Sequence, residues 1–124
     1  MTIACPNMLD QADSNRENSW EVFDSNAIRS TLEGGKVQYQ EFLRVPSLSC
    51  GVYHLPKGAT DMQAPHDEDE VYFVLEGRAR MTVNDEVREV SAGNILYVKA
   101  TASHSFFEIE EDMTLLVFFA SAIT

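Results

Sequence analysis

His66, Glu70 and His104 are the residues whose types and spacing suggest a metal site. His66 and Glu70 lie four positions apart at the entry to an apolar run, and such residues project to the same side of an extended segment. His104 opens a second apolar segment and shares its face with Phe106. Two imidazoles and one carboxylate suit a divalent transition metal and leave coordination positions open, as in non-haem Fe(II) sites. We therefore expect these three residues to converge on one divalent ion, with Fe(II) favoured and Zn, Mn or Ni as alternatives.

Two further side chains are candidates for proton transfer beside that ion. Tyr72 has the same strand parity as Glu70, so it is predicted to face the same cavity. His54 is a lone histidine in an apolar run, where a core role is the usual one, but it is a second candidate to line the pocket. Gln63 and Glu68 are candidates for an additional ligand, and spacing alone assigns neither.

The elements that must position these residues are short β-type runs separated by turn residues. Helical signal is limited to residues 25–32, where Gly34 and Gly35 end it. This pattern is typical of a β-sandwich or barrel, and the predicted strands are 36–45, 49–55, 71–75, 78–83, 86–90, 95–98, 104–109 and 113–120.

The domain organisation follows from length and composition. A chain of 124 residues with 44% apolar residues accommodates one domain. Residues 1–19 are polar and aperiodic, which predicts a flexible arm or one that packs on a partner subunit, and residues 20–124 form the barrel domain.

Charge and cysteine content limit the possible partners and the compartment. A net charge of −11 argues against nucleic acid and anionic membranes, and no window approaches a membrane-spanning length. The N-terminus lacks a signal-peptide pattern, and two cysteines are too few for a disulfide framework. We therefore expect a cytoplasmic protein with reduced thiols, although Cys5 and Cys50 are also compatible with a single bridge.

Two predicted strands are apolar on both faces, namely VYFVL at 71–75 and LLVFFA at 115–120. One face of each strand can line the barrel. The other face needs cover from a second sheet or a second subunit. A homodimer is therefore expected.

The two candidate metal-binding segments resemble the two motifs of the cupin family. PHDEDEVYFVLEG matches the first motif, with His66 in the place of its second histidine, Glu70 as its glutamate and Gly77 as its closing glycine. GNILYVKATASHSFFE resembles the second motif, where Gly93 and His104 fall into register. The resemblance covers roughly residues 48–120. It implies an all-β double-stranded β-helix, or jelly-roll barrel, with a short N-terminal helical segment here and usually one bound metal.

The chain departs from the cupin pattern at several positions. Ala64 stands where the family has its first histidine, which leaves three protein ligands and a more open metal. Lys99 and Thr101 replace a proline and a glycine of the second motif, and Glu108 replaces an asparagine. These latter changes affect the backbone of a turn rather than the metal ligands.

The resemblance implies a metal-dependent enzyme that acts on a small molecule in the barrel cavity. Its reaction would be dioxygenase-like, or that of a lyase or isomerase. One alternative is a non-catalytic module that binds a small ligand or metal. The other is a metal-free structural or dimerisation protein, which stays an alternative because the first histidine is absent.

Overall fold

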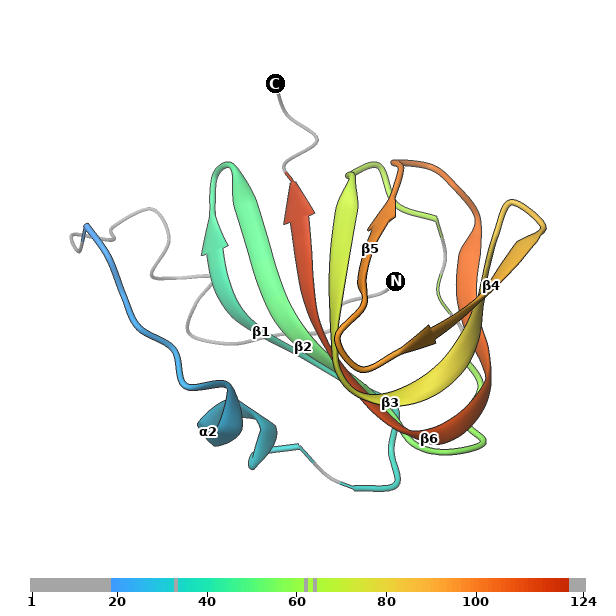
Figure 1. The fold of residues 1–124 in the computed structure, drawn as a ribbon. Coiled ribbons are helices and arrows are strands. Elements are labelled where there is room, and N and C mark those ends of the chain that lie inside the picture. Colours follow the sequence, from blue (N-terminus) through green and yellow to red (C-terminus); the bar gives the residue numbers. More distant parts are fainter. Residues whose placement is uncertain (1–18, 33, 62, 64, 121–124) are drawn as a thin grey trace.

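The computed structural model describes residues 19–32, 34–61, 63 and 65–120, and it consists almost entirely of β-strands (Figure 1). The predicted all-β class is confirmed. Nearly all of the predicted arm at 1–19 lies outside the described residues, as does Ala64. The elements are α2 (Ser25–Arg29), β1 (Gln38–Val45), β2 (Leu48–Leu55), β3 (Glu70–Val83), β4 (Glu86–Ser91), β5 (Ile95–Val98) and β6 (His104–Ala120).

Two pairs of predicted strands are continuous in the structure, so six strands replace the expected eight. β3 joins 71–75 to 78–83, because Gly77 adopts a positive φ of 98° and bends the strand without ending it. β6 joins 104–109 to 113–120 through a charged stretch, where Glu110 and Glu111 form ion pairs with Arg78 of β3.

The strands are antiparallel and follow the order β1-β2-β6-β3-β4, with β5 also paired to β3. The first half of β3 pairs with β5 and the second half with β4, so this long bent strand belongs to both walls of the molecule. Figure 1 shows β3 and β6 curving together around an interior that the shorter strands close. Residues from distant parts of the chain therefore face one another inside the barrel.

The bend at Gly77 also changes which residues of β3 face inward. Before it, the even-numbered Tyr72 and Val74 are fully buried; after it, the odd-numbered Ala79 and Met81 are buried. A bulge adds one residue to the strand and so reverses the alternation, and the register of β3 against β6 shifts at this point. The interior receives further buried side chains from β2 and β6, including Leu55, Phe106, Leu115 and Val117.

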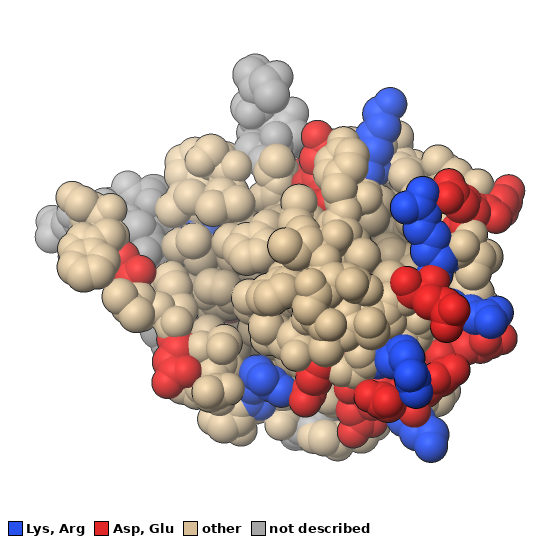
Figure 2. Space-filling model, viewed as in Figure 1, with Lys and Arg blue, Asp and Glu red and all other residues tan. Residues whose placement is uncertain are grey.

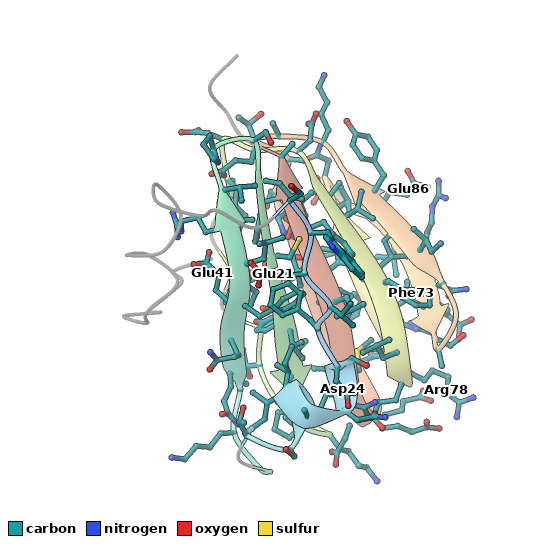
Figure 3. All side chains as sticks on the ribbon, turned by 90° about the vertical axis from the view of Figure 1, so that its left-hand side faces the viewer. Glu21, Asp24, Glu41, Phe73, Arg78 and Glu86 are labelled. Carbon is teal, nitrogen blue, oxygen red and sulfur yellow. The ribbon has the colours of Figure 1, made fainter. Side chains whose placement is uncertain are left out.

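The segment before β1 lies against the outside of the barrel. Figure 3 shows Glu21 and Asp24 on a stretch that passes in front of the strands, and the Phe23 ring packs 4.9 Å from that of Phe42. The Asp24 carboxylate accepts a hydrogen bond from Asn26 N and caps α2, which ends after Arg29 and is shorter than the predicted 25–32. Among the described residues, no helix has the length and apolarity required to cross a membrane.

Candidate metal centre

The three predicted ligands converge in space. His66, Glu70 and His104 each offer one ligand atom, and these atoms lie within 4.8 Å of one another. Glu70 and His104 are the first residues of β3 and β6, and His66 lies in the loop that leads into β3. The aromatic ring of Phe119 packs 5.1 Å from the His66 ring, so the site has an apolar neighbour on one side. Glu70 and His104 are buried, whereas His66 is half-buried.

The hydrogen bond at the far side of the His104 ring sets its tautomer. His104 Nδ1 lies 2.9 Å from the Ala102 carbonyl oxygen, which can only accept, so Nδ1 carries the proton. Nε2 is then left with its lone pair in the neutral ring. This is the arrangement that a metal-binding histidine requires, because the bond at one nitrogen orients the other toward the ion.

His104 Nε2 and Glu70 Oε1 approach to 3.0 Å, with both side chains almost fully buried. That distance would allow an ion pair. The two groups are nevertheless not aligned as a hydrogen bond, and both His104 Nε2 and Glu70 Oε2 are buried without a hydrogen-bond partner. A lone pair and a carboxylate held this close, away from water, require a shared cation, either a proton or a metal ion.

The two histidines differ in their affinity for a proton. Burial alone lowers the pKa of His104, but the Glu70 carboxylate and the Ala102 carbonyl outweigh it, so the pKa lies above its usual value. Burial lowers the pKa of His66 below its usual value. In the metal-free protein the Glu70 carboxylate therefore favours the protonated form of His104, and an incoming ion has to displace that proton.

Two of the replaced residues, one in the turn before β6 and one within β6, have positive φ angles. Thr101, at the family's glycine position, has a φ of 68°, and Glu108, at the asparagine position, has a φ of 46°. Both are left-handed conformations that glycine and asparagine adopt more readily. Thr101 N donates a hydrogen bond of 2.6 Å to the His66 carbonyl, so this strained turn holds the loop of His66 beside the strand of His104.

A chain of buried hydrogen bonds surrounds Tyr72 inside the barrel. The Tyr72 hydroxyl donates to Gln63 Oε1 at 2.9 Å, and Gln63 Nε2 donates to Asp61 Oδ2 at 2.7 Å. Asp61 also accepts from the Tyr53 hydroxyl at 2.6 Å and from Phe106 N at 2.8 Å. Burial, together with the nearby Glu70 carboxylate, raises the pKa of Tyr72 well above its usual value. Tyr72 is therefore a neutral phenol beside the metal ligands.

This chain explains why Gln63 does not complete the ligand set. The amide nitrogen of Gln63 donates a hydrogen bond to Asp61, and its amide oxygen accepts one from Tyr72. Glu68 also stays outside the group of converging ligand atoms. Asp61 is the site residue that sequence reasoning missed. It lies in an aperiodic stretch where an isolated acid is usually a surface residue, and no motif marks it as buried.

His54 lies on the opposite side of the barrel wall. Its neighbour Tyr53 points inward, so strand alternation turns His54 outward, where Nδ1 lies 3.2 Å from Thr114 Oγ1. Thr114 in turn donates to Glu76, which is paired with Arg29 of α2 at 2.7 Å. His54 lines a separate cavity of about 420 Å³ beneath α2. The structure thus brings Tyr72 to the metal ligands but not His54, and the catalytic role predicted for His54 lacks a geometric basis.

Comparison with known proteins relates the chain to one family. The model of the cupin domain matches residues 51–119. A curated relative, an uncharacterized protein of Streptomyces coelicolor, is 48% identical over 102 residues that cover 82% of this chain and 94% of the relative.

Two solved structures show the likeness in fold. TT1209 from Thermus thermophilus superposes with a TM-score of 0.68 at 23% identity, over 82% of this chain and 98% of that one. DddQ from Ruegeria pomeroyi, described as a DMSP lyase, superposes with a TM-score of 0.58 at 22% identity, over 63% of this chain and 40% of that one. Together with the family match, these likenesses confirm the predicted jelly-roll barrel.

Proposed function

This chain belongs to the cupin family, and we propose that its barrel holds one divalent transition metal at which a small molecule reacts. The observation that carries the proposal is the buried approach of His104 Nε2 to Glu70 Oε1, at 3.0 Å, in a group of three ligand atoms within 4.8 Å of one another. His66, from the facing loop, supplies the third ligand atom. Fe(II) is the favoured ion, because two histidines and one carboxylate form the ligand set of non-haem iron sites.

Such an ion, when bound, supplies a Lewis acid for an oxygen donor or a binding position for dioxygen. Two reaction classes fit this chemistry: dioxygenation, and a lyase or isomerase reaction. Among the described residues beside the ligands, Tyr72 is the proposed hydrogen-bond donor to a substrate. Its hydroxyl hydrogen is directed at Gln63, and its raised pKa keeps it protonated, so it can donate a hydrogen bond to a substrate by exchanging partners but cannot act as a base.

The hydrogen bond from the Tyr72 hydroxyl to Gln63 favours a second candidate function. If its hydroxyl stays bonded to Gln63 when a ligand enters, the substrate does not receive this hydrogen bond. The barrel would then serve as a non-catalytic module that binds a metal and a small ligand. Fold alone does not separate these functions, because cupin barrels host many activities.

The metal content of purified protein after reconstitution tests the proposal. We expect about one equivalent of Fe(II), Mn(II) or Zn(II) per chain, and loss of most of it in His66→Ala and His104→Ala. His54→Ala removes the remaining histidine of the chain, outside the barrel, and is the matched control that keeps its metal. Full metal content in His104→Ala, or none in the wild-type protein, would contradict the assignment.

A further inference from the structure

A second feature of the molecule is an open cavity of about 420 Å³ between the β3–β4 hairpin and β5. We call it the β4–β5 cavity. Its volume falls within the range of roughly 300–1,000 Å³ that small-molecule sites occupy. Among the described strands, β4 and β5 each pair with β3 alone, so the edges of both strands face this opening. One part of its lining is apolar and consists of Met81, Val83, Val90, Leu96 and Val98, and another part is polar and consists of Asn84, Glu86 and Arg88.

The apolar walls continue up to the metal ligands. Val98 of β5 lies directly opposite Glu70, and Val83 lies directly opposite His104. Opposed residues of antiparallel strands point to the same face, with Cβ atoms about 4.5–5.5 Å apart. A molecule in contact with Val83 and Val98 therefore lies beside the two buried ligands. The cavity therefore adjoins the metal centre, whose three ligands lie outside its lining.

The polar groups at the cavity mouth provide no free charge for an ionic substrate. Arg88 and Glu86 line the mouth, and they form an ion pair with each other at 2.8 Å. The chain carries a net charge of −11, which disfavours an anionic group held away from the metal. The metal centre is then the strong polar partner for a molecule bound in the cavity.

We propose that the β4–β5 cavity holds the compact, uncharged apolar body of a substrate whose oxygen-donor head faces the ion at Glu70 and His104. The substrate class is thus a small amphipathic molecule rather than a sugar or a polyanion. The head-group part of this inference rests on the proposed metal site, whereas the apolar part rests on the cavity walls alone.

Two hydroxamic acids test the proposal on the Zn(II)-loaded protein. Acetohydroxamic and benzohydroxamic acid share one chelating head and differ only in the size of the apolar body. We expect benzohydroxamic acid to bind roughly tenfold more tightly or better by calorimetry, because its ring buries more apolar surface. Val83→Phe fills the cavity and should abolish most of this preference, with little effect on acetohydroxamic acid. Val87→Phe, at an exposed position of β4, is the matched control that keeps the preference.

A metal-free measurement separates the two proposals. In protein labelled with ¹³C-methyl methionine, saturable binding of phenol should shift the methyl signal of Met81, which lines the cavity, and leave that of the fully buried Met113 in place. A shift of Met81 in a protein that takes up no metal would support the apolar site and overturn only the metal site. Equal affinities for the two hydroxamic acids with an unmoved Met81 signal would overturn the cavity proposal, whatever metal is bound.

Discussion

At the scale of single residues, the metal centre is defined by how each histidine is held. His104 is oriented by the Ala102 carbonyl, and the loop of His66 is held by its backbone contact with Thr101. Glu70 contributes a buried carboxylate that lacks a hydrogen-bond partner at Oε2. Such a site is organised before the ion arrives, which reduces the cost of binding it.

Metal affinity should depend on pH through His104. Its pKa is raised in the metal-free protein, so below that pKa a proton occupies the position that the ion needs. We expect the affinity for Zn(II) to fall by up to about tenfold per pH unit as the pH drops below this pKa, and to level off above it. Calorimetry at about pH 6, below the ordinary histidine pKa of about 6.5, in buffers of different ionisation enthalpy should detect a proton released on binding. Binding without proton release would contradict the proposed state of His104.

Thr101 is expected to lower the stability of the fold. A β-branched side chain at a φ of 68° is strained, so Thr101→Gly should stabilise the fold by about 1 kcal/mol in urea denaturation. Thr82→Gly in β3 is the control, since glycine in an ordinary strand should destabilise by about 1 kcal/mol. Destabilisation of similar size in both variants would show that the turn carries no strain.

At the scale of elements, Gly77 allows β3 to serve both walls of the barrel. A Cβ at this position would lie 2.7 Å from Met113 Cα and would also contact the Asp112 carbonyl of β6. The corner between β4 and β5 also depends on this bend, because Ala92 N donates to the Gly77 carbonyl and Gly93 N donates to that of Val74. The bend thus places β5, and with it one wall of the β4–β5 cavity.

Gly77→Ala should therefore be far more damaging than a comparable change at Gly93. Both glycines have φ values near 95°, but a Cβ at Gly93 meets no atom within 4 Å. We expect Gly93→Ala to destabilise by about 1 kcal/mol, from backbone strain alone, and Gly77→Ala by roughly 3 kcal/mol or more, from strain and overlap with β6. Denaturant midpoints measure both. Equal losses would mean that β6 moves aside at little cost.

At the scale of the whole molecule, the outer surface carries a broad area without charged side chains, in the centre of the view of Figure 2, while Lys, Arg, Asp and Glu gather toward the β4 side. On the outer side of the barrel wall, Phe73 and Val71 of β3 lie opposite Ile95 and Tyr97 of β5, which are 72% and 63% exposed. Figure 3 places Phe73 on this outer side. Such a face is unusual on a chain with a net charge of −11.

We expect this face to pair two copies of the chain, as the two-sided apolar strands predicted. Ile95→Glu would place two carboxylates in a symmetric contact and should give a monomer by light scattering coupled to size exclusion. Val87→Glu adds the same charge at an exposed position of β4 and should leave the dimer intact. A wild-type protein that is monomeric at micromolar concentration would contradict the expectation.

The sequence by itself determined the fold class and the three candidate ligands. Strand alternation and turn residues are local properties, so 95–98 was predicted with its observed bounds, and 49–55 and 86–90 to within one residue. The spacing of His66 and Glu70, together with the family pattern around His104, identified the residues that converge.

Only the tertiary structure decided which face of each strand is inside and which loop polar groups are buried. Alternation alone does not tell whether His54 points into the barrel or toward α2, because the choice depends on strands that pair with β2 from far along the chain. Burial of Asp61 likewise arises from contacts with Tyr53 and Phe106, which no local pattern encodes. These features result from packing between segments distant in sequence, whereas secondary structure and motif spacing are set by near neighbours.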